Sequence, residues 1–410
     1  MERVVVTGLG VISCIGLDVP AFWKSLIGGV SGVDRISAFD PAPHKTQIAA
    51  QVKDFAFDPK KVKRIERFSQ FAVAAADQAL EQSGLELNTD GAIPPERIGV
   101  SIGTGIGGIS FIEQQHAKFL KRGPGKFHPL TVPIVIANMA PAHVAMKHNL
   151  RGPNLCISTA CATGNHSIGN AFDLIRLGRA DAMLAGGTEA VITPFSLEGY
   201  SLLGALSTRN GEPQRASRPF SVSRDGFVLA EGGAVLLLES LSSAKRRGAE
   251  FLAEVAGFGM TADAHHLTAP DPQAAGAVGA MQAALADAQM RPGQIGYINA
   301  HGTSTPLNDA LETQAIKRVF GEEAGGIPVS SIKSMLGHAL GGAAAIEAVA
   351  SVLVLVHGAI PPTINLDDPD PELDLDYVPL EARQQRVDSV MSNSLAFGGQ
   401  NAVTIFRQFA

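Results

Sequence analysis

The chain has 410 residues, of which 45% are hydrophobic and 18% charged, with a formal net charge of −6 at pH 7. This length and apolar content allow a large core, built as one large domain or as two fused halves. A net negative charge argues against a general nucleic-acid-binding surface. Three cysteines are too few for a disulfide framework and fit a reducing cytosol.

Neither a signal peptide nor a membrane span is expected. The N-terminus enters a strand pattern directly at Arg3, without a charged and apolar leader. The longest apolar run, Ala348 to Val356, is too short to cross a bilayer. We therefore expect a cytoplasmic protein.

Short β-branched runs alternate with longer apolar helices along the chain, and each strand ends in glycine or a small residue. This alternation predicts an α/β fold with largely parallel sheets that helices cover on both faces. The expected strands are Val4 to Thr7, Ile98 to Ile102, Asp181 to Gly187 and Ala234 to Leu238, and the expected helices are Phe22 to Leu26, Phe68 to Leu80, Asn138 to Met146 and Ala244 to Arg247.

The stretch from Cys156 to Gly169 is the first candidate for chemistry. It opens with a buried-strand pattern, passes through small residues around Cys161, and continues as an apolar helix. A thiol at a helix N-terminus feels the positive end of the helix dipole, which favours the thiolate. A small buried core cysteine explains the same residues, so this stretch alone leaves both interpretations open.

The strand, glycine and helix patterns of the first half recur in the second half in the same order. The segment from Arg97 resembles that from Gln294, Ser158 to Gly169 resembles Ser330 to Ile346, and the segment from Phe227 resembles that from Leu395. Three matches in one order indicate an internal duplication. Two stacked copies predict a layered α-β-α-β-α body.

The second half places three further polar residues where strands are expected to end. His301 lies in Asn-Ala-His-Gly-Thr-Ser-Thr-Pro, and Lys333 and His338 frame Lys-Ser-Met-Leu-Gly-His. Open α/β sheets place ligands at strand ends. Any one histidine could be structural, but two histidines and a lysine facing a cysteine favour a catalytic set.

These residues resemble the β-ketoacyl–acyl carrier protein synthases of the thiolase superfamily, most closely the elongating type II enzymes. The resemblance rests on the motifs of Cys161, His301 and Lys333 to His338, and on Phe397-Gly-Gly-Gln-Asn and Ser207-Thr-Arg-Asn. It covers essentially the whole chain and implies the duplicated thiolase fold in a homodimer. We expect a half carrying the nucleophile over residues 1–250 and a half carrying the histidines over residues 251–410.

The resemblance implies three chemical steps without a cofactor, on substrates carried by the phosphopantetheine of acyl carrier protein. They are acyl transfer to Cys161, decarboxylation of malonyl carrier protein, and Claisen condensation in fatty acid elongation. A thiolate attacks thioesters and also leaves from them. Backbone N–H groups of Cys161 and Phe397 would form the oxyanion hole, each worth roughly 3–4 kcal/mol. His301 and His338 would donate to the enolate oxygen as neutral imidazoles, beside a protonated Lys333.

Further roles follow from the same resemblance. Thr303 and Thr305 would bind the pantetheine arm, Phe397 would gate the acyl pocket, and Ile106 would limit chain length near the dimer interface. His266 would lie near the substrate entrance, and Asn299, Glu312, Glu347 and Asn393 would be structural. Lys63, Arg64 and Lys126 would dock the acidic carrier protein, although an ordinary solvated charge run explains them equally well. Some relatives bind a structural monovalent cation, but we expect no metal here.

The sequence departs from the family at Leu336, at Gln400 and at Leu395-Ala396. Alanine tolerates positive φ less readily than glycine, so Ala396 is expected to stiffen the gate. A specialised ketosynthase of a polyketide or polyene pathway shares every catalytic residue and remains an alternative. A chain-length factor is disfavoured because Cys161 is present, a degradative thiolase because no cysteine follows it, and an initiating synthase because His338 replaces asparagine.

Overall fold

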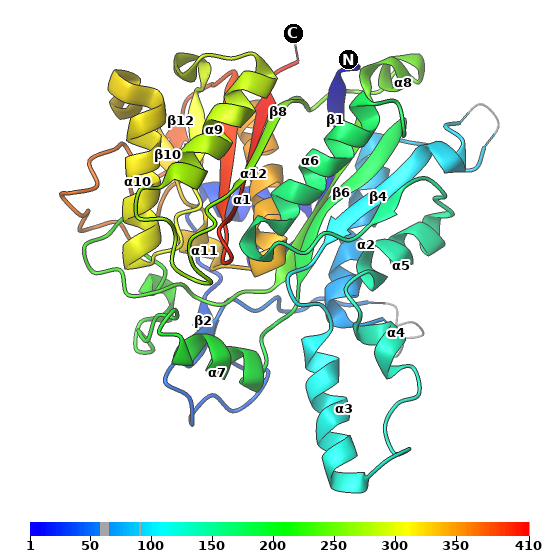
Figure 1. Ribbon diagram of the computed structural model, residues 1–410, viewed down its shortest axis with the longest axis vertical. Helices are drawn as coiled ribbons and strands as arrows, with labels where there is room; N and C mark the ends of the chain where they lie inside the picture. The colour runs from blue at the N-terminus through cyan, green and yellow to red at the C-terminus, as the bar shows by residue number, and fades with distance from the viewer. Residues whose placement is uncertain (58–64, 90–91, 410) are drawn as a thin grey trace.

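A computed structural model describes residues 1–57, 65–89 and 92–409. Ten strands form one continuous sheet in the order β10-β9-β13-β14-β8-β1-β7-β6-β4-β5 (Figure 1). The strands of this sheet are β1 (Val4–Ile12), β4 (Ile98–Gly103), β5 (Asn154–Leu155), β6 (Ala182–Glu189), β7 (Gly232–Ser240), β8 (Ala253–Ala262), β9 (Tyr297–Asn299), β10 (Val329–Ser330), β13 (Ser389–Leu395) and β14 (Gln400–Arg407). Short pairs outside it are β2 (Asp34–Arg35) with β3 (Ile48–Ala49), and β11 (Ala359–Ile360) with β12 (Arg383–Gln384).

The sheet consists of two halves with the same strand order. Numbered within each half, both β5-β4-β6-β7-β1 and β10-β9-β13-β14-β8 run third, second, fourth, fifth, first. The halves join where β1 pairs antiparallel with β8, through Val4 and Val255. This repeated order is the structural form of the duplication indicated by the sequence.

The sheet is mixed, as expected, and its parallel pairings lie towards its two ends. β4 pairs parallel with β5 and β6, and β9 pairs parallel with β10 and β13. The central pairings from β13 through β6 are antiparallel, so antiparallel pairing is more frequent than the sequence suggested. The antiparallel pairings that the sequence did not indicate involve β1 and β7 and their counterparts β8 and β14. These four strands lie where the two halves join.

Helices α6 and α12 form a central layer between the two halves. Each packs against strands of both halves, and the two helices also pack against each other. Helices α2 and α5 cover the outer face of the first half, and α9 with α10 covers that of the second, which gives the expected α-β-α-β-α layers. The α-helices are α1 (Val19–Ile27), α2 (Arg67–Ser83), α3 (Ile109–Arg122), α4 (Thr131–Val135), α5 (Met139–His148), α6 (Thr163–Arg176), α7 (Pro194–Leu202), α8 (Leu241–Arg246), α9 (Ala275–Ala288), α10 (Pro306–Phe320), α11 (Lys333–Leu336) and α12 (Ala343–His357).

Both central helices begin with the same local structure. A 3₁₀ turn, Ala160–Ala162, precedes α6, and another, Leu340–Gly342, precedes α12. The first residue of each turn has a positive φ, 47° at Ala160 and 45° at Leu340, although neither is glycine. Such strained conformations persist where the surrounding structure fixes them, and they cluster at functional sites.

One helical stretch, Leu340–His357, is long and apolar enough to cross a membrane, contrary to the sequence estimate from its longest apolar run. Its residues are 89% buried within the protein. Its apolar character therefore fits the central layer, where it contacts a sheet half on each side.

Helices α3 and α4 extend away from the sheets as a separate lobe (Figure 1).

The close approach of α2 to β1 depends on glycine. A Cβ atom built on Gly10 would lie 1.8 Å from the carbonyl oxygen of Ala75 in α2, so a side chain there must push the helix away. We expect Gly10→Ala to lower the free energy of unfolding by about 1–3 kcal/mol, the usual cost of overpacking. Urea denaturation measures this, with Gly211→Ala as the control because nothing lies within 4 Å of a Cβ there. Equal stability of the two variants would contradict the packing described here.

Candidate active site

Cys161 lies at the N-terminal end of the central helix α6, in the 3₁₀ turn that precedes it. The buried strand expected from Cys156 is not formed. The strand before the turn is only Asn154–Leu155, both of whose residues are exposed at the end of the sheet, and residues 156–159 are irregular. This irregular approach lets the chain turn sharply at Ala160 and directs the thiol towards the second half. The side chain of Cys161 is buried, with 6% of the residue exposed.

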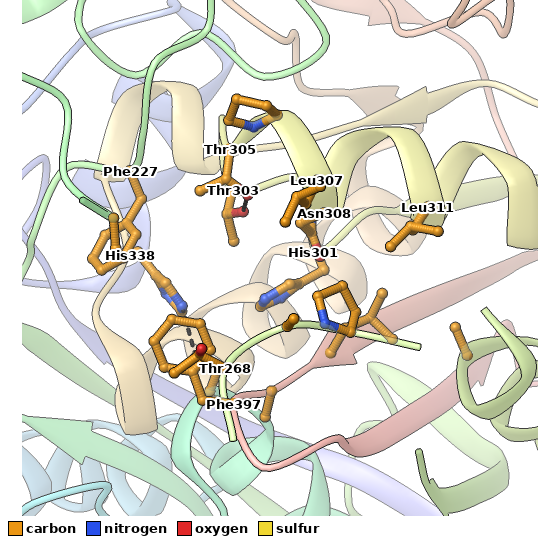
Figure 2. A pocket seen from close by; sticks show the side chains of 18 of the residues that line it. Phe227, Thr268, His301, Thr303, Thr305, Leu307, Asn308, Leu311, His338 and Phe397 are labelled. Atoms are coloured by element: carbon orange, nitrogen blue, oxygen red, sulfur yellow. Dashed lines mark hydrogen bonds between the residues drawn. The ribbon is translucent and has the colours of Figure 1, made fainter. Parts of the chain in front are cut away.

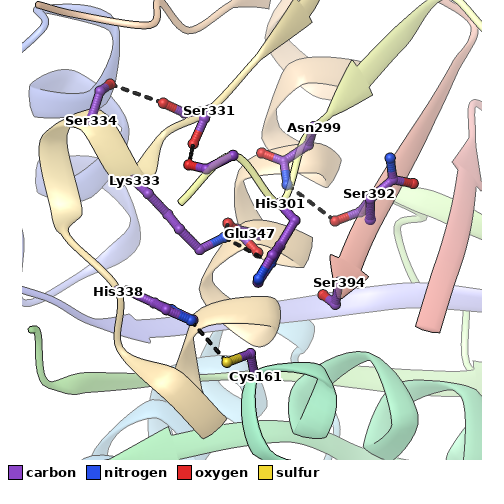
Figure 3. A network of polar contacts seen from close by, with 12 residues as sticks. Cys161, Asn299, His301, Ser331, Lys333, Ser334, His338, Glu347, Ser392 and Ser394 are labelled. Carbon is purple, nitrogen blue, oxygen red and sulfur yellow. Dashed lines mark hydrogen bonds and ion pairs between the residues drawn. The ribbon is translucent and has the colours of Figure 1, made fainter. Parts of the chain in front are cut away.

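His338 is the closest polar neighbour of the thiol. Its Nε2 lies 3.0 Å from Sγ of Cys161, as Figure 3 shows. The backbone of His338 is fixed on both sides, because its N–H donates to Val228 O and its carbonyl accepts from Ala230 N–H. The imidazole therefore faces the sulfur from a rigid segment just after α11.

His301 follows β9, and one carboxylate holds the backbone of His301 and of the next residue. Glu312 accepts hydrogen bonds from the N–H groups of His301 and Gly302, both at 2.8 Å. Lys333 Nζ donates to Nδ1 of His301 at 3.5 Å and forms an ion pair with Glu347 (Figure 3). Because Nδ1 accepts from the ammonium group, the neutral imidazole carries its proton on Nε2. The His301 and His338 rings lie 5.4 Å apart, edge to face.

Burial and charge keep both histidines neutral. Burial lowers the pKa of His301 and of His338 well below the ordinary value, and the positive charge of Lys333 lowers both further. Burial raises the pKa of the Cys161 thiol to about 11, although Lys333 and the backbone N–H groups of Phe397 and Cys161 oppose this. Desolvation is the largest of these effects, so burial opposes the thiolate that the helix position is expected to favour.

A cavity of about 380 Å³ opens onto this set of side chains. Cys161, His301 and His338 line it, together with Thr303, Thr305 and Phe397. Figure 2 shows both histidines, both threonines and Phe397 around the cavity. The hydroxyls of Thr303 and Thr305 lie 2.9 Å apart, so together they offer a polar strip along an otherwise apolar wall. The structure thus brings together the catalytic and pantetheine residues expected from the sequence.

His266 does not line the cavity but supports a segment that does. Its Nδ1 accepts hydrogen bonds from the backbone N–H groups of Thr268 and Ala269, two lining residues. The neighbouring Leu267 carbonyl accepts from Gly398 N–H at 2.8 Å, which joins this segment to the Phe397 loop. The sequence predicted that His266 lies near the substrate entrance. In the structure, His266 reaches the cavity through Thr268 and Ala269, the two lining residues whose backbone it holds.

The remaining expected residues lie away from the cavity or outside the described chain. Ile106 is 41% exposed and does not belong to the cavity lining. Lys126 is exposed in the segment between α3 and α4. Lys63 and Arg64 lie outside the described residues, so the structure places only one of the three expected docking cations.

The loop that carries Phe397 does not show the strain expected at Ala396. Its positive φ values belong to Gly398 and Gly399, at 83° and 71°, and not to Ala396. The alanine is therefore compatible with this conformation of the loop.

The cysteine and the two histidines have donor atoms within 4.8 Å of one another, close enough in principle to hold a metal ion. The hydrogen bonding does not favour this. A metal at Nε2 of His301 would require a proton on Nδ1, which faces the Lys333 ammonium. The set is better suited to presenting N–H donors to an oxyanion.

The region behind His301 is rich in side-chain oxygens, and some of these have no hydrogen-bond partner among the described residues. Within the described chain, the side-chain oxygens of Asn299 and Asn393 are buried without a partner, and Asn393 Nδ2 donates to Glu312 at 3.1 Å. Carbonyl and carboxylate oxygens are suitable ligands for a hard cation. The expectation of no metal stays a prediction, because these buried oxygens are of the type that ligates hard cations.

Several lining residues were not singled out from the sequence. Phe227 packs edge to face on the His338 ring at 5.4 Å, and Leu311, Asn308 and Leu340 line the cavity. Asn308 and Leu311 lie on α10, and Leu340 lies in the 3₁₀ turn before α12. Their contact with the cavity becomes visible only once the two halves are brought together.

The chain belongs to the β-ketoacyl synthase family. The model of the β-ketoacyl synthase N-terminal domain matches residues 1–244, and that of the C-terminal domain matches residues 252–367. A 3-oxoacyl-[acyl-carrier-protein] synthase 2 of Coxiella burnetii is 50% identical over 98% of both chains, and one of Synechocystis is 48% identical over 100% of this chain and 98% of that one.

Solved structures agree with this assignment. The ketosynthase of a type II polyketide synthase, determined in complex with its acyl-carrier protein, matches with a TM-score of 0.93 at 38% identity over the full length of both chains. A β-ketoacyl synthase from Burkholderia phymatum matches with a TM-score of 0.92 at 36% identity, again over both full chains.

The electrostatics predict how Lys333 controls the thiol. Lys333→Met removes the charge that opposes the raised pKa of Cys161, so this pKa rises further and less thiolate forms at a given pH. We expect alkylation of Cys161 by iodoacetamide near pH 9 to slow by roughly tenfold for each unit of pKa change. Peptide mass spectrometry distinguishes Cys161 from Cys14 and Cys156.

The matched control is Lys317→Met, which removes a surface ion pair with Asp374. Its alkylation rate should equal that of the wild type. An unchanged rate in Lys333→Met would show that the lysine charge does not act on the thiol.

Proposed function

We propose that Cys161, His301, His338 and Lys333 carry out the decarboxylative condensation of fatty acid elongation. The protein joins an acyl group, held as a thioester on Cys161, with malonyl carrier protein to give 3-oxoacyl carrier protein, CO2 and free carrier protein. The observation that carries this proposal is the thiol 3.0 Å from one neutral imidazole, with a second imidazole beside it and a buried lysine behind.

In the first step the thiol attacks the acyl thioester. The thiol proton passes to solvent, and Sγ attacks the carbonyl carbon as a thiolate while the Nε2–H of neutral His338 donates to it at 3.0 Å. The backbone N–H groups of Cys161 and Phe397 approach the sulfur and are suited to the oxyanion that forms on the carbonyl oxygen. The pantetheine sulfur leaves as a thiolate and takes a proton from solvent, and His338 stays neutral with its proton on Nε2.

In the second step malonyl carrier protein loses CO2. The electrons of the broken carbon–carbon bond form an enolate, and N–H donors of His301 and His338 stabilise its oxygen. Lys333 keeps His301 in the tautomer that donates from Nε2. The enolate carbon then attacks the acyl thioester on Cys161, and the released thiolate takes a proton from solvent.

The substrate arm and the partners belong to the same proposal. Thr303 and Thr305 bind the pantetheine, Phe397 gates the acyl pocket, and the exposed Lys126 contributes to docking of the acidic carrier protein. A homodimer is supported by Ile106 and by Leu155 on the terminal strand β5, each 41% exposed at one end of the sheet. The division into halves at residue 250 follows the repeated strand order, and the burial of α12 suits a cytoplasmic protein.

A specialised ketosynthase is the second candidate, because the ketosynthase of a type II polyketide synthase shares this fold over the full length of both chains. The fatty acid assignment is favoured by the higher identity to the curated synthases.

Acylation of the thiol tests the function directly. After incubation with acyl carrier proteins of increasing chain length, we expect intact mass to show one acyl group on the wild type and on Cys156→Ala, and none on Cys161→Ala. Cys156 is the matched control because it is half-buried nearby in the sequence. An adduct that survives in Cys161→Ala would refute the assignment, and acylation confined to oxygenated polyketide chains would favour the second candidate.

A further inference from the structure

Glu189 is a fully buried carboxylate that no step above uses. It is the last residue of β6 and has no exposed surface. Its Oε1 accepts from the Thr104 hydroxyl at 2.8 Å and from Ile106 N–H at 3.2 Å. Its Oε2 accepts from Gly105 N–H at 2.7 Å and from Gly341 N–H at 3.1 Å. All four donors are neutral, which is an unusual environment for a buried carboxylate.

These donors belong to two segments that come from different halves of the chain. Thr104 to Ile106 directly follows β4, whereas Gly341 lies in the 3₁₀ turn before α12. That turn packs against the 3₁₀ turn that carries Cys161. The carboxylate therefore connects the Ile106 segment to the immediate support of the nucleophile.

The backbone around the Glu189 carboxylate is packed too closely to admit a further side chain. A Cβ on Gly341 would lie 2.3 Å from Gly105 N, and a Cβ on Gly187 would lie 2.2 Å from Gly341 O. Thr104 also accepts from Gly107 N–H at 3.2 Å, which continues the network along the Ile106 segment. If one acceptor oxygen of Glu189 is lost, we therefore expect the backbone to move, because the N–H groups that it accepted from lose their partner.

The duplication supplies an internal comparison. β4 and β9 occupy the same place in the two halves, and the loop after β9 is held by Glu312 through the N–H groups of His301 and Gly302. Glu189 accepts from two successive N–H groups after β4 in the same manner. One carboxylate thus fixes the loop of a catalytic histidine, and the other fixes the loop of Ile106.

We propose that Glu189 is a positioning residue that sets the acyl-chain range of the site by fixing the Ile106 segment against the Cys161 turn. This inference rests on the proposed function and on the role expected for Ile106 from the family resemblance, which is to limit chain length near the dimer interface. The negative charge of Glu189 also acts on the thiol, because it contributes to the raised pKa of Cys161.

Two substitutions separate the hydrogen bonds from the charge. Glu189→Gln removes both the charge and half of the acceptor sites. Thr104→Val removes the hydrogen bond to Glu189 and the one from Gly107 N–H, while the charge of Glu189 stays. The control Glu239→Gln alters another fully buried carboxylate, which pairs with Arg247 and Thr7 away from the cavity. The measurements are kcat/KM for short and long acyl carrier proteins, and the rate of Cys161 alkylation by iodoacetamide.

We expect the ratio of kcat/KM for long to short chains to rise by roughly tenfold in Glu189→Gln and by less in Thr104→Val, because small displacements at a reactive site have large effects on rate. Alkylation at fixed pH should be faster in Glu189→Gln and unchanged in Thr104→Val. Glu239→Gln should alter neither quantity.

An unchanged chain-length ratio in folded Glu189→Gln would overturn the inference. Where that variant does not fold, Thr104→Val decides by the same ratio. Failure of the wild type to become acylated at Cys161 would instead refute the proposed function.

Discussion

The site depends on one buried ammonium group, that of Lys333, which lies between two buried imidazoles and a buried carboxylate. Lys333 is held by Glu347 and donates to His301 Nδ1, so its charge lowers the pKa of both histidines and opposes the raised pKa of the thiol. A charge in this position favours thiolate and enolate, the two anions of the reaction, while it disfavours imidazolium. In the proposed mechanism, one lysine would therefore serve acyl transfer and decarboxylation without acting as a general base.

The duplicated fold explains how this arrangement is built. The first half contributes the thiol at the start of α6, and the second contributes both histidines and the lysine from loops around β9 and α11. The two turns that begin α6 and α12 pack against each other with matching positive φ at Ala160 and Leu340. Catalysis and the packing of the two halves thus depend on the same interface.

The sequence predicted the elements whose signals are local. The strand pattern of residues 4–7, the long helix after Phe68 and the motifs around Cys161, His301 and His338 all carry short-range information, and the structure places them as expected. It could not predict the balance between burial and helix dipole at Cys161, because burial depends on the opposite half. Glu189 was missed for the same reason, since its four hydrogen-bond donors come from two segments far from it in the sequence.

The central claim is that neutral imidazoles stabilise the enolate, and a single-turnover measurement tests it most directly. Enzyme already acylated on Cys161 is mixed with malonyl carrier protein, and CO2 release is followed from about pH 6 to pH 8. Because the pKa values of His301 and His338 are lowered well below the ordinary value of 6.5, both rings stay neutral across this range and the rate should be flat. A rate that changes with a midpoint near the ordinary histidine pKa would contradict the account.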